Sequence, residues 1–500
     1  MNDSQVELNP NKIVRYLKKP GSEFTKQDLI KFIEDNDIGS VNFRYVGGDG
    51  RLKTLNFVIN HKSQLDQLLS AGERVDGSSL FSYIDAASSD LYVIPRYKTA
   101  YVNPFATIPT VDILCSYYTK EGDPLPSAPG SILRKAHKAL HDSLGLDLEA
   151  MGELEYYVLS DRQNTYPSMA QKGYHESSPF CKWEMLRYEA MQAIAQAGGN
   201  IKYGHSEVGH IFQKDKEIEQ NEIEFIPVAV EDAADQIAVA KWVLRMIGYR
   251  YGVSISFAPK IAVGHAGSGL HIHTKLVKAG KNVMTDGNTL TDLAKCNIAG
   301  YLSLAPSLTA FGNTVPTSYL RLVPHQEAPT NICWGDRNRS VLVRVPLGWL
   351  DVKNMISDAN PLEKEAVKGL NDNQTIEFRC PDGSANIHLL LAGLAVAARH
   401  GLEMENALEL AEKLYVDVNI FHEEHKSLCD TLPQLPTSCW ASAECLLKDR
   451  EVYERDGVFP AIVIDGLAAT LRKFNDKDLS EKCHGNADEI SKLVDEHFHC

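Results

Sequence analysis

Two histidines directly after a glycine-rich run stand out as residues that could bind a metal ion or a substrate. Residues 264–273 read GHAGSGLHIH, and the three glycines allow another group to approach the backbone closely. The segment Leu270–Leu276 alternates apolar and polar residues, which predicts a β-strand that points His271 and His273 to one face. By itself, the stretch is also typical of a hairpin turn followed by two surface histidines.

Glutamates recur in other segments that read as strands. Glu153 and Glu155 alternate with Leu and Tyr in GELEYYVL, so both point to one face of a strand. Taken alone, this pattern is also typical of an edge strand that shows its charges to water. Three further glutamates lie in short strand-like segments: Glu207 in HSEV, Glu222 in QNEIEF and Glu377 in TIEFRCP.

Glutamates that face one another inside a protein repel at a high free-energy cost unless positive charge lies among them. Divalent cations are the simplest source of that charge. Mostly oxygen ligands suit Mg²⁺ or Mn²⁺, and an imidazole in the set favours Mn²⁺ slightly. Zinc fits less well, because no cysteine accompanies the glutamates.

Arginines are concentrated in the segment from Ser318 to Pro346, which contains only two acidic residues, Glu327 and Asp336. A guanidinium group stays charged and can bind a carboxylate or phosphate through two parallel hydrogen bonds. Surface ion pairing is the commoner fate of arginine, but an arginine excess beside a metal site predicts bound anions, phosphates first. The arginines in question are Arg321, Arg337, Arg339, Arg344 and, further along, Arg379. No G-x-x-x-x-G-K-[ST] pattern occurs, so a nucleotide would be held without a P-loop.

The bulk properties narrow the class of protein. With 500 residues the chain predicts two domains, and the net charge of −15 argues against nucleic acid or an anionic membrane as the main partner. The N-terminus lacks the apolar core of a signal peptide, and the longest apolar run, Leu389–Ala398, is too short to span a bilayer. The ten cysteines form no C-x-x-C pair, which favours buried thiols and a cytoplasmic protein.

The order of predicted elements divides the chain into an N-terminal extension (1–23), a small α+β domain (24–119) and a large domain (120–500). A helix is expected over Asn11–Lys19, and a hairpin with its tip at 47–50 opens the small domain. The proline-rich run 123–130 is the best linker in the chain. In the large domain, an antiparallel sheet carries the polar motifs and helices pack behind it.

Eight short motifs, in order between residues 76 and 382, resemble glutamine synthetase of the long-chain bacterial type, often called type I. They are D-G-S-S at Asp76, G-E-x-E, H-S-E-V, Q-N-E, G-S-G-x-H-x-H, R-L-V-P-x-x-E-A-P, R-N-R-S-x-x-x-R-x-P and I-E-x-R-x-P-D. Each motif alone is weak, but eight in order are highly specific. The resemblance implies an α+β protein with an N-terminal β-grasp domain. It also implies a catalytic domain whose curved antiparallel sheet is backed by helices, as in guanidino kinases.

The resemblance also implies a homo-oligomer of two stacked rings, a dodecamer in the family, with active sites between subunits. Each site would bind ATP and two or three Mg²⁺ or Mn²⁺ ions. The first ion would be held by Glu155, Glu207 and Glu222, and the second, which bridges the ATP phosphates, by Glu153, His271 and Glu377.

The remaining site residues follow from the same resemblance. The nucleotide and its phosphates would be contacted by His273, Arg339 and Arg344. The α-carboxylate of glutamate would be bound by Arg321, and its γ-carboxyl group by Arg379. Gly267 would offer its backbone to the α-amino group. The ammonium site would comprise Ser79, Tyr174 and Asp76, the last from the adjacent subunit, and Glu327 would take a proton from ammonium.

The chain departs from the family pattern at a few positions. Ala266 stands where Asn usually helps to bind the amino end of glutamate, Thr375 replaces an arginine near the phosphates, and Lys275 replaces a common serine. Cys429 occupies the position of the tyrosine that some bacterial enzymes adenylylate, so we predict that this chain is not regulated by adenylylation. Incubation with an adenylyltransferase followed by mass spectrometry tests this prediction. An added AMP in this loop would refute it.

Three alternatives remain open. A γ-glutamyl-amine ligase on the same scaffold would use an organic amine in place of ammonia. A guanidino-phosphotransferase would share the fold but would need neither the ammonium turn nor Glu327. A non-enzymatic relative would not be expected to keep intact metal and arginine sets.

Overall fold

The N-terminal part of the chain folds around a mixed sheet in the order β2-β1-β6-β4-β3, with β5 paired to β6. The computed structural model describes residues 6–213, 215–323, 328–348, 355–365, 373–483 and 486–500. Strands β1 and β6 run parallel at the centre, and the β1–β2 hairpin turns at 47–50 as predicted. The strands are β1 (Ser40–Val46), β2 (Leu52–Val58), β3 (Glu73–Asp76), β4 (Asp90–Pro95), β5 (Tyr101–Val102) and β6 (Thr110–Tyr118).

Three helices cover this sheet: α2 (Lys12–Leu17), α3 (Lys26–Asp35) and α4 (Lys62–Ala71). Helix α3 begins where Thr25 and Asp28 cap each other's backbone N–H groups, an arrangement that satisfies donors a helix start leaves free. Helix α2 confirms the predicted short helix, and its Ile13 and Val14 are buried in the N-terminal core. This helix of the N-terminal extension is therefore packed onto the core.

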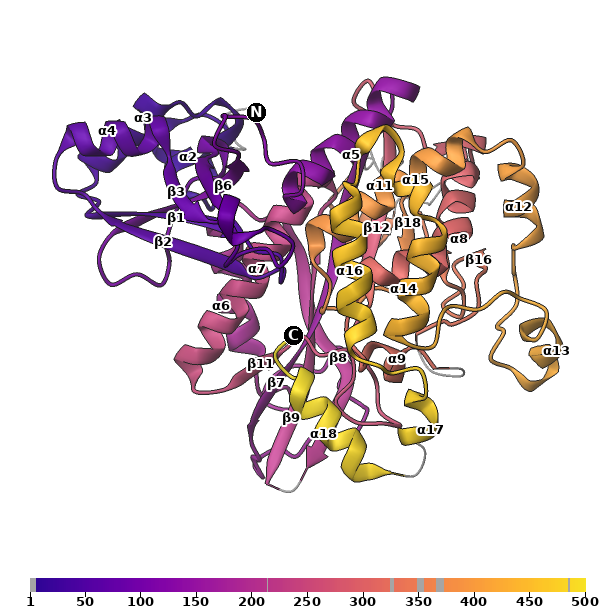
Figure 1. The fold of residues 1–500 in the computed structure, drawn as a ribbon. Helices are drawn as coiled ribbons and strands as arrows, with labels where there is room; N and C mark the ends of the chain where they lie inside the picture. The colour runs from indigo at the N-terminus through magenta and orange to yellow at the C-terminus, as the bar shows by residue number, and fades with distance from the viewer. Residues whose placement is uncertain (1–5, 214, 324–327, 349–354, 366–372, 484–485) are drawn as a thin grey trace.

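The larger part contains a ten-stranded sheet in which seven strands are neighbours in the order β16-β17-β18-β12-β7-β9-β8. Three short strands lie off this path: β10 (Val228–Ala229) and β11 (Ser254–Ser256) pair with β7, and β13 (Lys281–Asn282) pairs with β12. The long strands of the sheet pair antiparallel, as predicted, but β16 and β17 at one edge run parallel, which the sequence did not indicate. The main strands are β7 (Asp147–Asp161), β8 (Ile201–Gln213), β9 (Lys216–Phe225), β12 (Leu270–Lys278), β16 (Trp334–Asp336), β17 (Val343–Val345) and β18 (Ile376–Phe378). Figure 1 shows the N-terminal part beside the large sheet, whose other side is flanked by C-terminal helices.

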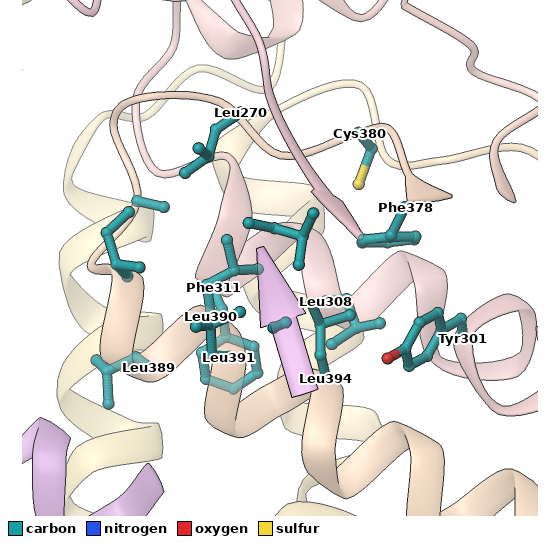
Figure 2. Packing of buried hydrophobic residues seen from close by; sticks show 14 of the residues in the cluster. Leu270, Tyr301, Leu308, Phe311, Phe378, Cys380, Leu389, Leu390, Leu391 and Leu394 are labelled. Atoms are coloured by element: carbon teal, nitrogen blue, oxygen red, sulfur yellow. The ribbon is translucent and has the colours of Figure 1, made fainter. Parts of the chain in front are cut away.

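The helices behind the sheet form one continuous hydrophobic core with it. Figure 2 shows Leu270 of β12 and Phe378 of β18 near side chains of two long helices, α8 (Asp292–Gly312) and α11 (Ile387–Glu403). These helices cross at Gly300 and Gly401: a Cβ on Gly300 would lie 2.0 Å from the carbonyl oxygen of Ala397, and one on Gly401 would lie 2.1 Å from that of Cys296. The apolar side chains on one face of the strands therefore pack against the helices, and the polar side chains lie on the other face.

Several other helices complete the large part: α5 (Pro129–Leu144), α6 (Glu184–Gln196), α7 (Val230–Tyr251), α12 (Ala407–Lys413), α14 (Cys439–Lys448), α15 (Arg450–Glu454), α16 (Ala461–Lys473) and α18 (Ala487–His497). Among the described residues, no single helix is long and apolar enough to cross a membrane. Only α11 and α12 taken together pass such a test, and they are bent by 106°.

The proline-rich run 123–130, which we predict to be the linker between the two domains, is partly packed against the N-terminal core. Pro124 forms an isolated bridge with Tyr118, Leu125 and Ala128 are buried, and α5 already begins at Pro129. The run packs because its few apolar side chains reach the N-terminal core. The domain limits at residues 23 and 119 stay a prediction.

Candidate active site

A cavity of about 1320 Å³ opens on the polar face of the large sheet. Most of the predicted site residues line it: Glu153, Glu155, Tyr174, Glu207, Glu222, Gly267, His271, His273, Arg321, Arg339, Arg344, Glu377 and Arg379. Asp76 and Ser79 are described residues that do not line the cavity of the same chain. Glu327 falls outside the described residues.

Strand register brings together residues that are far apart in sequence. His271 of β12 pairs with Glu153 of β7, and Glu155 of β7 pairs with Glu222 of β9. On the other side of β12, Glu377 of β18 pairs with His273. Directly opposed residues on neighbouring strands have their Cβ atoms within about 5.5 Å, so this register places the side chains within reach of a common ligand.

Two imidazoles and two carboxylates form the centre of the cavity. His271 Nδ1 lies 2.9 Å from a Glu153 oxygen and 3.4 Å from a Glu377 oxygen, while His273 Nε2 lies 3.0 Å from Glu153. Burial works to lower the pKa of His271, but hydrogen bonds with Glu153 and Glu377 raise it to about 9. Burial likewise opposes ionisation of Glu153, but His273 and His271 hold its pKa well below the usual range.

Glu222 shows the opposite behaviour. Burial, and then repulsion from Glu153, Glu155, Glu207 and Glu224, raises its pKa well above the usual value. Carboxylates that crowd together without enough positive charge retain a proton or attract a cation. The local electrostatics therefore favour a cation beside Glu222.

Three sets of side chains within this region have ligand atoms close enough to share an ion: Glu153, His273 and Glu377; His205, Glu207 and Glu222; and Glu153, Glu222 and Glu224. His205 and Glu224 were missed by the sequence analysis. Each lies two residues from a predicted ligand on the same strand, so the period-two rule that grouped Glu153 with Glu155 would also have found them. His273, predicted as a nucleotide contact, also lies in a set that could hold an ion.

Glu155 is fixed in place by neutral donors. The side-chain amide of Gln220 and the backbone N–H of Gly269 each donate to the same Glu155 oxygen at 2.8 Å. Gln220 also donates to the Gly267 carbonyl oxygen at 2.9 Å. These bonds hold the carboxylate in one orientation, and neither of them uses its second oxygen.

The arginines divide into two groups. Arg344 and Arg379 donate to the two oxygens of Glu377 at 2.8 and 2.9 Å, so their charge is partly balanced within the protein. Buried Arg321 instead donates to backbone carbonyl oxygens, among them Cys380 at 2.7 Å and Pro381 at 3.2 Å. A buried guanidinium held by carbonyl oxygens keeps its positive charge for an anionic ligand.

The residues predicted for ammonium lie on the surface of this chain. Asp76 ends β3 and accepts hydrogen bonds from the hydroxyl groups of Ser79 and Ser78 at 2.5 and 2.7 Å, which hold its pKa well below the usual range. Half-exposed Tyr174 stacks on His175 at a ring distance of 4.2 Å. Asp76 is thus an ionised, exposed carboxylate available to another molecule.

Comparison with known proteins agrees with this architecture. Residues 126–481 match the family model described as "Glutamine synthetase, catalytic domain", and residues 37–120 match "Glutamine synthetase, beta-Grasp domain". The chain belongs to the glutamine synthetase family. The predictions of this family, of the fold class and of an enzyme of the glutamate–ammonia ligase family are confirmed, and the non-enzymatic alternative is wrong.

Named relatives cover most of the chain. A glutamine synthetase of Clostridium saccharobutylicum is 30% identical over 424 residues, which are 82% of this chain and 87% of the relative. One from Mycolicibacterium smegmatis is 28% identical over 89% of this chain and 94% of the relative.

Two solved structures have the same fold. The Plasmodium falciparum glutamine synthetase has a TM-score of 0.73 at 19% identity, over 93% of this chain and 98% of that one. A structure titled GmaS/ADP complex has a TM-score of 0.69 at 18% identity, over 94% of this chain and 99% of that one.

The departures from the family pattern have defined places in the glutamine synthetase fold. The N–H of Ala266 donates to Gln171 Oε1 at 2.7 Å, and its carbonyl oxygen accepts from Tyr157 at 2.8 Å. Thr375 Oγ1 lies 3.0 Å from His273 Nδ1. Lys275 pairs with Glu149 at 2.9 Å. Each substituted residue is thus integrated in the local packing around the cavity.

Proposed function

We propose that the chain joins ammonia to the γ-carboxylate of L-glutamate at the expense of ATP, and that it forms L-glutamine, ADP and phosphate. The observation that most supports this is that carboxylate–imidazole sets and five arginines line one cavity. Such a cavity can hold a nucleotide triphosphate through cations and a small anionic substrate through Arg321.

The reaction would take place in two steps. A γ-carboxylate oxygen attacks the γ-phosphorus of ATP, the bond to ADP breaks, and γ-glutamyl phosphate forms. Arg379 would orient that carboxylate, and Arg339 and Arg344 would stabilise charge on the phosphoryl oxygens. Ammonia nitrogen then attacks the acyl carbon, and phosphate leaves. Glu327 would take the proton that ammonium must lose, and Asp76 of a neighbouring subunit, with Ser79 and Tyr174, would attract the cation.

The residues present fit a pair of divalent ions. Crowded carboxylates with a raised pKa at Glu222 and two imidazoles give the oxygen-rich, partly nitrogen donor set that Mg²⁺ or Mn²⁺ accepts. Glu155, Glu207 and Glu222 would hold one ion, and Glu153, His271 and Glu377 the other, with His205, His273 and Glu224 close by. When bound, the ions would neutralise negative charge on the phosphates.

The main alternative is a γ-glutamyl-amine ligase. Retention of Asp76, Ser79, Tyr174 and Glu327 favours ammonia, because acidic and polar side chains attract the small ammonium cation. Ala266 and Thr375 are the positions where a change of substrate would originate.

Phosphate release distinguishes the two reactions. The purified chain is assayed with ATP, Mg²⁺ or Mn²⁺ and glutamate, with ammonia, ethanolamine or a polyamine as the amine donor, and with each component omitted in turn. Phosphate release that depends on glutamate and ammonia is expected. Release with the organic amines alone would replace this proposal by the alternative.

Glu327→Ala is expected to keep ATP and glutamate binding but to lose most glutamine formation, and full turnover in that variant would remove Glu327 from the mechanism.

We also propose a cytoplasmic homo-oligomer of stacked rings. Asp76 and Ser79 lie outside the cavity of their own chain. An active site between subunits would bring them to the cavity of a neighbour.

A further inference from the structure

The segment from Gln171 to His175 runs along β8, the edge strand of the large sheet, beside the catalytic cavity. Three of its backbone N–H groups donate to carbonyl oxygens of β8: Gln171 to His210 at 3.2 Å, Gly173 to Val208 at 3.3 Å and His175 to Ser206 at 3.0 Å. The donors advance by two residues while the acceptors retreat by two, as between antiparallel strands. The 171–175 segment therefore follows β8 over this length.

Gly173 is where the 171–175 segment comes closest to β8. A Cβ at this position would lie 2.4 Å from the carbonyl oxygen of Glu207, so only glycine fits without a shift of the backbone. The Ser206 hydroxyl also donates to the Gly173 carbonyl oxygen at 2.7 Å. Tyr174, which lines the catalytic cavity, is therefore held beside the strand that carries Glu207.

The side chain of Gln171 connects the 171–175 segment to the glycine-rich loop at 264–269. Its Oε1 accepts from the Ala266 N–H at 2.7 Å, and its Nε2 donates to the His210 carbonyl oxygen at 3.2 Å. Gln171 has a positive φ of 56°, which residues other than glycine seldom adopt unless surrounding contacts support it. Ala266 and Gly267 line the catalytic cavity, whereas Gln171 is a described residue that does not, so it can act on a substrate only through its neighbours.

Other hydrogen bonds tie the same loop to the sheet. The Tyr157 hydroxyl of β7 donates to the Ala266 carbonyl oxygen at 2.8 Å, and Gln220 of β9 donates to the Gly267 carbonyl oxygen at 2.9 Å. These donors fix the loop relative to the sheet, while Gln171 fixes it relative to the segment that carries Tyr174. The loop and Tyr174 are thus held in one arrangement by a side chain outside the cavity.

We propose that Gln171 is a positioning residue that sets the distance between the backbone of Gly267 and the ring of Tyr174. In the proposed function, on which this inference rests, these two groups bind glutamate and ammonium. Attack of ammonia on the acyl carbon requires the two reactants to be aligned at about 3–3.5 Å, whereas phosphoryl transfer from ATP to glutamate requires no ammonium.

A displaced loop therefore impairs the second step more than the first. γ-Glutamyl phosphate still forms, but a water oxygen attacks its acyl carbon in place of ammonia, phosphate leaves and glutamate is regenerated. The ratio of glutamine formed to phosphate released reports this loss. General destabilisation of the fold would lower both products together and leave their ratio unchanged.

Three variants test the proposal, with ATP and glutamate saturating and ammonium varied. Gln171→Met keeps the length of the side chain but removes both of its hydrogen bonds. The product ratio is expected to fall below that of wild type, and the KM for ammonium to rise roughly two- to tenfold, as for loss of a neutral hydrogen bond. Gln171→Glu keeps an oxygen that accepts from Ala266 and is expected to retain more of the wild-type ratio. Gln163→Met, at an exposed glutamine in the same connection between β7 and α6, is the matched control and is expected to behave as wild type.

A product ratio equal to that of wild type in Gln171→Met would overturn the proposal. If that variant does not fold, amide hydrogen exchange of wild type, resolved to single residues by fragmentation mass spectrometry, decides. Slow exchange of the Ala266 amide supports the link, and exchange as fast as that of an exposed loop amide refutes it. If wild type uses only an organic amine, the proposed function is wrong, and the same product ratio, measured with that amine, decides on Gln171.

Discussion

At the scale of single residues, charge balance explains why these side chains lie together. Glu377 is neutralised by Arg344 and Arg379, and Glu153 by two imidazoles, whereas Glu222 has mostly other carboxylates around it. Bringing like charges into one buried region is unfavourable without a compensating cation. The catalytic cavity is thus balanced at one end and deficient in positive charge at the other.

Replacing Glu222 tests this deficit. Without metal, Glu222→Gln is expected to unfold at a higher temperature than wild type at neutral pH, because one buried repulsion is removed. When Mn²⁺ is present at a hundredfold excess over its Kd for wild type, the free energy of unfolding of wild type is expected to rise by about 2.7 kcal/mol. That of the variant is expected to rise much less. Calorimetry with and without Mn²⁺ measures both effects. Glu149→Gln, on the neighbouring strand β7 but outside the ion-binding sets, is the control, and an equal rise with Mn²⁺ in Glu222→Gln would contradict the assignment.

Arg321 is expected to set the affinity for glutamate. Arg321→Ala removes a charge-assisted contact of about 1.5–3 kcal/mol, which corresponds to a rise of roughly 10- to 150-fold in the KM for glutamate. Arg321→Lys keeps the charge and is expected to lose less. Steady-state kinetics at saturating ATP provide the measurement. A normal KM in the alanine variant would show that another residue binds the α-carboxylate.

At the scale of elements, buried contacts between α7 and its neighbours hold the sheet and the N-terminal part in place. Asp235 of α7 accepts two hydrogen bonds from Arg96, at 2.6 and 3.0 Å, and lies 3.1 Å from His388 of α11. Burial raises the pKa of Asp235, but Arg96 and His388 together hold it well below the usual range. One carboxylate thus joins three segments of the fold.

Asp235→Asn is expected to destabilise the protein by about 3–5 kcal/mol at neutral pH, because it leaves Arg96 without its partner. Asp235 has a depressed folded-state pKa, so its contribution is fully present above the unfolded-state pKa of about 3.9 and is lost as the pH falls towards the folded-state value. The difference between wild type and variant is therefore expected to shrink below about pH 4. Urea unfolding at pH 7, 5 and 3.5 measures it; a difference independent of pH would contradict this account.

The crossing of α8 and α11 depends on the absence of side chains at two glycines. Gly300→Ala places a Cβ 2.0 Å from a backbone carbonyl oxygen, so the helices must separate. Overpacking of this kind costs about 1–3 kcal/mol, and activity is expected to fall as the sheet behind the cavity shifts. Gly130→Ala in α5, whose new Cβ would meet its nearest neighbour at 3.9 Å, is the matched control for chemical denaturation. Equal stability of the two variants would rule out this packing argument.

At the scale of the whole molecule, two residues that the proposed reaction would use, Asp76 and Ser79, do not line the cavity of their own chain. The ionised carboxylate of Asp76 is exposed on the N-terminal part, whereas Arg321 lines the catalytic cavity. An arrangement of copies around a symmetry axis repeats the same contact between every pair of neighbours, so each copy can complete the next.

Mixing two impaired variants tests shared sites, provided that activity is assayed at a glutamate concentration far below the raised KM of Arg321→Ala. Asp76→Ala and Arg321→Ala oligomers are dissociated, mixed in equal amounts and reassembled. By random assembly, roughly a quarter of the sites regain both residues, so about that fraction of wild-type activity is expected. Each variant reassembled alone is the control. No recovery in mixed oligomers that have re-formed, as shown by light scattering, would place Asp76 and Arg321 in the same chain's site or outside catalysis.

The sequence alone determined the strands and the faces of their polar residues, because alternation with period two requires only local backbone geometry. It therefore predicted Glu153 with Glu155 and His271 with His273, and eight ordered motifs identified the family. Strand register decided which of these residues meet: Glu377 lies beside Arg344 and His271 because β18 pairs with β12 and β17. The period-two rule could have placed His205 and Glu224 on the same faces as Glu207 and Glu222, but only tertiary packing decided that they lie next to the other ion-binding residues, because that depends on contacts between strands far apart in the chain.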